Sequence, residues 1–106
     1  MVSRGDICWM DRPDIGRRPA CVLTRNEAIP VLTKVTVAIV TSTIRGNKTE
    51  VHLTREDGVS RDCVISLDNL FTVERDSLER PIAHLSATKM IEVCRALDHA
   101  AGCGRR

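Results

Sequence analysis

The sequence predicts an α+β protein in which several short antiparallel strands form a compact, barrel-like sheet and one C-terminal helix packs on it. Three observations predict this class. Most of residues 5–85 are short apolar or alternating segments separated by Gly, Pro, Asp and Asn. Residues 35–40, V-T-V-A-I-V, are nearly all β-branched or apolar, and only residues 86–102 show helical spacing. With 106 residues, the chain has the length of a single domain, 1–106.

The first third of the chain predicts two strands and two irregular connections. Residues 5–11 alternate as a strand, and residues 12–18, R-P-D-I-G-R-R, form a loop interrupted by Pro and Gly. Residues 19–24 are an apolar strand that begins with a proline, which is tolerated at a first strand position. Residues 25–32 are predicted to be an irregular connection.

The middle of the chain supplies the rest of the sheet. The run at residues 35–40 indicates a central strand that is covered on both faces. Residues 41–48 form a polar bend, and residues 49–54 alternate strictly, as in a strand with one exposed face. Three more short strands are predicted at residues 63–67, 71–74 and 82–85.

The last helix has recognisable start and stop signals. Ser86 is a favourable N-cap residue, and Gly102 is placed to end the helix. Between them, apolar residues recur at helical spacing and predict one buried stripe of Met90, Val93, Cys94, Leu97 and Ala101.

Arginine dominates the basic residues. Only three of the 16 basic side chains are lysines, and the formal net charge is +2. The planar guanidinium matches two phosphate oxygens at once, which favours a nucleic-acid partner. A GC-rich genome enriches arginine as well and explains the bias equally. Trp9 and Phe71 are the only aromatic residues, so any stacking on bases rests on them or on arginine planes.

The five cysteines predict neither a disulfide framework nor a zinc site, because their number is odd and no C-x-x-C pair occurs. Cys8, Cys21 and Cys63 lie in apolar strand segments, where free cysteine behaves as a small hydrophobe. We expect no metal and no cofactor. No apolar run approaches about 18 residues, and the N-terminus has no apolar stretch of signal-peptide type, so a cytoplasmic protein without a membrane span is expected.

Five sequence patterns follow one another in a fixed order along the chain. Together they resemble the MazF/PemK family of toxin ribonucleases over residues 4–102. The patterns are R-G-D-I-x-W at 4–9, G-R-R-P at 16–19, V-T-S-T-I-R-G at 40–46, D-C-V-I-S-L-D-N-L at 62–70 and L-S-A-x-K-M-x-E-V-x-x-A-L at 85–97.

The resemblance implies a fold and an activity. Members of the family have an SH3-like barrel with packed helices, shared with CcdB toxins, and work as homodimers. They belong to type II toxin-antitoxin systems and cut single-stranded RNA at short sequence motifs without a metal. The target expected here is mRNA, with tRNA and rRNA as alternatives. A MazE-like antitoxin is the expected inhibitor, and it covers the RNA groove.

Two catalytic positions are carried over from the family. The arginine of its R-P motif falls on Arg18, and the hydroxyl residue that ends its central strand falls on Thr41. Metal-free RNA cleavage uses the neighbouring 2′-hydroxyl as nucleophile and needs positive charge at the phosphate. A fixed guanidinium suits that task, and a threonine hydroxyl can donate to a phosphate oxygen. Further RNA-binding candidates are Arg17, Ser42, Arg45, Lys48, Asp14 and Trp9.

Each of these further candidates has a structural alternative. Arg45 and Lys48 flank a Gly-Asn turn and fit a solvated hairpin tip as well as an RNA contact. Arg17 faces either phosphate or water. Trp9 stacks on a base or belongs to the core or a dimer contact.

The acid and the base are not assigned by the sequence. The family loop between the first two strands is longer and often carries Gly-Ser-Glu, whereas residues 12–17 here hold Asp14 as their only acid. Histidine is a residue type suited to acid-base catalysis, so His52, His84 and His99 are the other candidates. Each also has a structural interpretation: an outward strand position, a place before the helix cap, and the last helical turn.

Two other function classes stay open at this point. A CcdB-type toxin of the same fold poisons DNA gyrase through aromatic and glycine residues at its C-terminus, whereas residues 102–106 here, G-C-G-R-R, hold no aromatic. A non-catalytic SH3-like RNA-binding module is the second alternative. The pairing of Arg18 with Thr41 argues against it.

Overall fold

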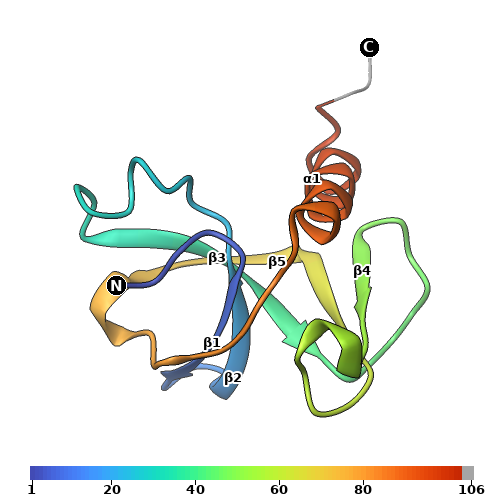
Figure 1. The fold of residues 1–106 in the computed structure, drawn as a ribbon, viewed down its shortest axis with the longest axis horizontal. Coiled ribbons are helices and arrows are strands. Elements are labelled where there is room, and N and C mark those ends of the chain that lie inside the picture. The colour runs from blue at the N-terminus through green and yellow to red at the C-terminus, as the bar shows by residue number, and fades with distance from the viewer. Residues whose placement is uncertain (104–106) are drawn as a thin grey trace.

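One curled, six-stranded antiparallel sheet and one helix make up the computed structural model, which describes residues 1–103 (Figure 1). The sheet order β4-β5-β3-β2-β1-β6 and the C-terminal helix confirm the predicted α+β class. Residues 104–106, and with them most of the tail that speaks against a CcdB-type toxin, lie outside the described part. The elements are β1 (Asp6–Arg12), β2 (Gly16–Val22), β3 (Lys34–Thr41), β4 (Glu50–Leu53), η1 (Arg55–Asp57), β5 (Cys63–Glu74), η2 (Arg75–Ser77), β6 (Pro81–His84) and α1 (Ala87–Ala101).

Both faces of the sheet are buried, each against its own layer. Helix α1 packs against β4 and β5 and covers one face (Figure 1). The segment before β3 and the residues after η2 supply side chains to the other core. Alternation along each strand divides the side chains between the layers, so β3 is buried on both faces, as its apolar run predicts. The first core includes Ile7, Cys21, Val40, Leu53 and Val93; the second includes Cys8, Met10, Val22, Ile29 and Val37.

The hairpin between β1 and β2 is tighter than predicted. Residues 12–18 were expected to form a loop, but the ladder pairs Arg12 with Gly16 and only residues 13–15 lie outside the strands. Gly16 has φ +78°, which a side chain would strain. The pairing with β1 extends the strand through Arg17 and Arg18, and both are therefore held on a rigid strand.

A single strand, β5, replaces the two strands predicted at residues 63–67 and 71–74. Both halves pair with β3, and a register shift between Ala38 and Ile39 accommodates the residues between them. Such a bulge bends a strand without ending it. Asn69 Nδ2 donates to Ser66 Oγ at 2.8 Å within this bend, so these two side chains satisfy each other there.

Helix α1 begins and ends where its capping residues predict. Ser86 Oγ accepts a hydrogen bond from the Lys89 backbone N–H at 3.1 Å, and Gly102 closes the helix with φ +71°. The predicted stripe is partly wrong. Met90 and Val93 are buried, but Cys94 and Ala101 are exposed, and Ala96 is buried in their place. The helix is rotated so that a small residue faces the sheet.

Three of the cysteines belong to the core, as predicted. Cys8, Cys21 and Cys63 are buried free thiols. Burial raises the pKa of Cys8 to about 11 and that of Cys21 to about 12, because a thiolate would lose its hydration there. These thiols stay protonated near neutral pH and act as small apolar side chains.

Candidate active site

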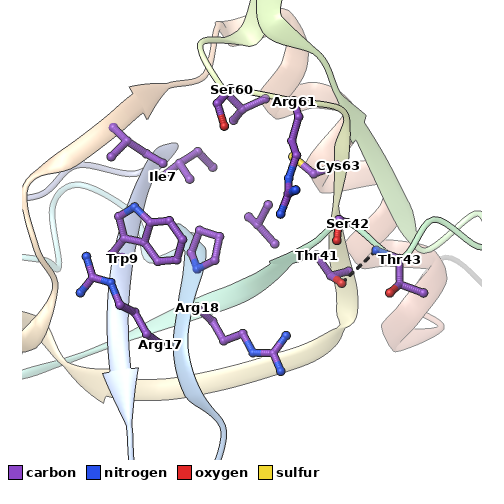
Figure 2. Close-up of a pocket in the computed structure, with 14 residues that line it drawn as sticks. Ile7, Trp9, Arg17, Arg18, Thr41, Ser42, Thr43, Ser60, Arg61 and Cys63 are labelled. Carbon is purple, nitrogen blue, oxygen red and sulfur yellow. Dashed lines mark hydrogen bonds between the residues drawn. The ribbon is translucent and has the colours of Figure 1, made fainter.

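A pocket of about 460 Å³ opens beside the first half of β2, the end of β3 and the segment that precedes β5 (Figure 2). We call it the Arg18 pocket. Its walls come from five parts of the chain, which explains why no single sequence segment describes it. The lining residues are Ile7, Trp9, Arg17, Arg18, Pro19, Val40, Thr41, Ser42, Thr43, Val59, Ser60, Arg61, Cys63 and Ile82.

The register of the sheet places Arg18 and Thr41 at the same end of the β2–β3 ladder. The ladder between β2 and β3 ends at the pair Ala20 and Ile39. Each step along an antiparallel ladder moves one residue on both strands, so two more steps of this register would set Arg18 opposite Thr41. The hydrogen-bonded ladder stops before that pair, and both residues line the pocket.

Arg18 is exposed and keeps most of its donors available. Its Nε donates to the Ile15 carbonyl oxygen at 3.3 Å, a weak contact that orients the guanidinium. Within residues 1–103 no carboxylate lies at ion-pair distance from it. The guanidinium therefore brings an uncompensated positive charge and a fork of N–H donors to the pocket.

Three consecutive hydroxyl residues, Thr41, Ser42 and Thr43, form the wall next to Arg18. The Thr43 backbone N–H donates to Thr41 Oγ1 at 3.1 Å, shown as a dashed line in Figure 2. This bond uses the oxygen of Thr41 as acceptor and leaves its O–H free to donate to a ligand. Thr41 is half-buried and its neighbours are exposed, so the wall presents hydroxyl donors from a fixed strand end.

Trp9 and Arg17 form the wall on the other side of the pocket. The Arg17 guanidinium lies over the Trp9 ring, 4.9 Å from its centroid, and forms a two-point ion pair with Glu79, with Nη2 to Oε1 at 2.9 Å. The Glu79 carboxylate raises the pKa of Arg17, and the guanidinium lowers the pKa of Glu79. The cation over the indole is thus partly neutralised by the protein itself.

Besides Thr43, the polar pocket residues Ser60 and Arg61 are absent from the sequence-based candidates. They precede β5 and are exposed. Figure 2 shows Arg61 entering the pocket from this segment, across from Arg18 on β2. The only signal for Arg61 in the sequence is weak, a charged residue just before an apolar strand. The sheet topology, and no local pattern, places Arg61 in the same pocket as Thr41.

The comparison with protein families settles the identity of the fold. A model described as "PemK-like, MazF-like toxin of type II toxin-antitoxin system" matches residues 3–101. The chain belongs to this family. The family resemblance inferred from the five sequence patterns is therefore confirmed. The expected MazF/PemK-type barrel is confirmed by the solved structures described below.

Individual MazF proteins match the chain over nearly its full length. The "probable endoribonuclease MazF5" of Mycobacterium tuberculosis is 38% identical over 104 residues, 97% of this chain and 95% of that protein. The structure of the Mycobacterium tuberculosis toxin MazF-mt6 has a TM-score of 0.84 at 34% identity and covers 92% of this chain and 96% of its own. A MazE-MazF structure from Deinococcus radiodurans has a TM-score of 0.78 at 29% identity and covers 95% of both chains.

Three of the predicted RNA-binding residues do not line the Arg18 pocket of this MazF/PemK-family chain. Asp14 sits in the β1–β2 turn, where both its oxygens accept from Arg12 at 3.0 and 3.1 Å. That contact lowers the pKa of Asp14 and makes it a weaker base. Arg45 and Lys48 are exposed on the segment between β3 and β4.

Glu50 organises the segment that carries Arg45 and Lys48. Its Oε1 accepts from the backbone N–H groups of residues 45, 46 and 47 at 3.1, 2.9 and 3.4 Å. The segment directly follows the hydroxyl wall of the pocket. Arg45 and Lys48 therefore occupy a shaped turn next to the pocket and not a wall of it.

The three histidines take structural positions outside the pocket lining. His52 faces outward from β4 with its Nε2 3.6 Å from Asp62 Oδ2. His84 Nδ1 lies 2.7 Å from Oδ1 of the buried Asp6. His99 occupies the last turn of α1, where a cation is favoured. The Arg18 pocket of the described chain is thus lined by guanidinium, hydroxyl, indole, thiol and aliphatic groups.

Within residues 1–103, no three side chains of His, Cys, Asp and Glu come together as a metal site would require. In that same range, α1 is neither long nor apolar enough to cross a membrane, and no other helix is a candidate.

Proposed function

We propose that this toxin is a metal-independent endoribonuclease that cleaves single-stranded RNA, and that Arg18 and Thr41 are its catalytic residues. One observation carries the proposal: the fold brings an uncompensated guanidinium and a hydroxyl donor to the same end of the β2–β3 ladder, in one open pocket. The endoribonuclease names of relatives at 37–38% identity support the same reaction.

The reaction proposed is an internal transesterification. The ribose 2′-oxygen attacks the adjacent phosphorus, the bond from phosphorus to the 5′-oxygen breaks, and the products are a 2′,3′-cyclic phosphate and a 5′-hydroxyl. The 2′-hydroxyl proton is lost and the departing 5′-oxygen gains a proton. Negative charge accumulates on the non-bridging oxygens between these events, so fixed donors aimed at that phosphate lower the barrier.

Each catalytic residue has a distinct part in this step. Arg18 binds two phosphate oxygens through its fork and balances the added negative charge. Thr41 donates its O–H to a phosphate oxygen, because the bond from the Thr43 N–H uses its oxygen as an acceptor and leaves the hydroxyl proton free. No carboxylate or imidazole lines the pocket within the described chain, so the proton transfers fall to water and to N–H and O–H groups of the pocket.

The remaining candidates bind RNA around this centre. Ser42 extends the hydroxyl wall, Trp9 stacks on a base, and Arg17 contacts a phosphate of the backbone. Arg45 and Lys48 hold the backbone of RNA that leaves the pocket past the hydroxyl wall. Asp14, bound to Arg12 outside the pocket, has no part in the proposal.

Assembly and partners complete the proposal. Two copies would form a symmetric homodimer that presents two Arg18 pockets to one RNA strand. A MazE-like antitoxin would inhibit the enzyme by covering the same surface. A MazE-MazF structure from Deinococcus radiodurans supports a partner of this kind, because a relative is seen there together with MazE. Because its substrate is cellular RNA, we place the toxin in the cytoplasm.

The test is cleavage of a long RNA by the purified protein in EDTA. Arg18→Ala should lower the rate at least about 10²-fold, and Arg18→Lys should restore little, because a point charge cannot form the fork. Thr41→Ala should also slow cleavage. Arg25→Ala and Thr72→Ala, exposed residues away from the pocket, are the controls. Near wild-type cleavage by the Arg18 variants would remove Arg18 from the site, whereas gyrase inhibition without cut RNA would favour the CcdB-type alternative.

A further inference from the structure

Besides Arg17 and Arg18, the Arg18 pocket contains a third guanidinium, Arg61, to which neither the family motifs nor the sequence gives a role. Arg61 lies in the segment between η1 and β5 and lines the pocket from the side across from β2 (Figure 2). It is exposed, so its position has to come from the backbone that carries it.

That backbone is anchored on both sides of Arg61. Val59 and Cys63, two residues before and after it, are each buried to 8% exposure in the core that contacts α1. Gly58 has φ +97°, and a Cβ built there would lie 3.1 Å from Ala83 Cβ, so the chain passes tightly against β6. Only residues 60–62 between these anchors stay exposed, and they are too few to move far.

The preceding 3-10 turn is fixed as well. Thr54 and Asp57 form a capping box on η1, in which the Thr54 side chain accepts from a backbone N–H and the Asp57 carboxylate accepts from the Thr54 N–H at 2.9 Å. Lys89 of α1 ties this turn to the helix, with Nζ 3.8 Å from Asp57 Oδ2 and 3.2 Å from the His52 carbonyl oxygen. The Arg61 side chain therefore projects from a backbone segment that is held rigidly.

The charge of Arg61 is not compensated inside the described chain. Arg17, on the same pocket, is bound to Glu79, but no carboxylate among residues 1–103 lies at ion-pair distance from Arg61. The carboxylate of the neighbouring Asp62 lies instead 3.6 Å from His52 Nε2. The pocket thus has two guanidinium groups available for an anion, Arg18 on one wall and Arg61 on the other.

We propose that Arg61 is a substrate-binding residue that contacts a phosphate of the RNA from the wall opposite Arg18. The inference rests on the proposed ribonuclease function and extends it, because it makes the RNA pass between β2 and the segment before β5. A phosphodiester is the ligand that fits two guanidinium groups beside a wall of hydroxyl donors.

The test measures binding of a single-stranded oligoribonucleotide whose 2′-hydroxyls are methylated, so that it cannot be cleaved. Arg61→Ala should weaken binding several-fold at low salt and reduce the slope of log K against log salt by about 0.7, the value for one phosphate contact on a single strand. Arg61→Lys should retain most of the affinity, since a point charge also binds phosphate. Arg55→Ala is the matched control, an exposed arginine on η1 outside the pocket lining.

The outcomes separate this inference from the proposed function. Wild-type protein must cut the unmodified RNA and bind the methylated strand; if it does neither, the ribonuclease proposal itself fails. If it does both and Arg61→Ala behaves like Arg55→Ala in affinity and salt slope, the role of Arg61 is refuted and that of Arg18 stands. Equal melting temperatures of Arg61→Ala and Arg55→Ala would show that a difference in affinity does not come from a difference in folding stability.

Discussion

Removal of the Glu79 carboxylate should strengthen RNA binding. In the free protein Glu79 holds Arg17 in a two-point ion pair beside the pocket, with the guanidinium stacked over Trp9. A phosphate that approaches Arg17 competes with this carboxylate. Glu79→Gln removes the negative charge and keeps the size of the side chain, so Arg17 becomes available to the RNA backbone.

The size of the gain follows from the exposure of the pair. The side chains of Arg17 and Glu79 are 51% and 44% exposed, and exposed ion pairs are weak, so affinity should rise only about 1.5- to 5-fold at low salt. One added phosphate contact also steepens the salt dependence by about 0.7 in log K against log salt. Between 50 and 200 mM salt, the affinity of the variant should therefore fall about 2.6-fold more than that of the wild type, which leaves less than about a 2-fold gain at 200 mM.

The assay is fluorescence anisotropy with the 2′-O-methylated strand at two salt concentrations. Glu74→Gln is the matched control, because it removes the same charge from an exposed residue outside the pocket. The double variant Arg17→Ala/Glu79→Gln should lose the gain, since the gain acts through Arg17. Weaker binding by Glu79→Gln would mean that RNA uses the intact pair as a stacking surface, and the reasoning would be refuted. An equal gain in the Glu74→Gln control would show that the higher affinity comes from the overall charge of the protein and not from Arg17.

Three further predictions concern the fold and the assembly. Gly58→Ala should lower the free energy of unfolding by about 1–2 kcal/mol because of its positive φ, and by a further amount because of the contact with Ala83. Gly46→Ala, with φ +76° and open space around it, should show only the first loss. Equal losses of the two variants in urea unfolding would contradict the effect of the Ala83 contact. Burial raises the pKa values of the Cys8 and Cys21 thiols, so the folded state keeps these protons to a higher pH than the unfolded state does. The free energy of unfolding should therefore fall as pH rises from about 9 toward 11–12, by up to about 1.4 kcal/mol per pH unit for each thiol. A flat profile from pH 8 to 10.5 would refute this. Sedimentation at micromolar concentration should give about twice the chain mass of 11.8 kDa, and a fully active monomer would exclude the dimer.

The parts of the fold that local chemistry controls were predictable from the sequence. The caps Ser86 and Gly102 mark the ends of α1, and the apolar run in β3 indicates burial on both faces, because these signals depend on neighbouring residues alone. The extent of β2 and the continuity of β5 were not predictable in this way. There, pairing with β1 and β3 extends the strands across residues whose local preference is a turn.

The candidate site divides in the same manner. Arg18 and Thr41 belong to motifs and follow from the sequence, and the sheet register then explains why both lie at one end of the β2–β3 ladder. Arg61 could not be found that way, since it enters the pocket through a buried anchor on each side of it. The capture of Arg17 by Glu79, 62 residues away, is likewise a tertiary contact that no local pattern contains.

Nucleophilic attack by the 2′-hydroxyl in a metal-free pocket is the central claim, and one substrate pair tests it most directly. After the cleaved bond is mapped on a defined transcript, the same RNA is made with a single 2′-deoxy nucleotide on the 5′ side of that bond, and both are incubated with wild-type protein in EDTA. The account predicts that the all-RNA strand is cut to a 2′,3′-cyclic phosphate and a 5′-hydroxyl, while the deoxy strand stays intact at that bond. Equal cleavage of both strands, or cleavage that returns only with added magnesium, would contradict it.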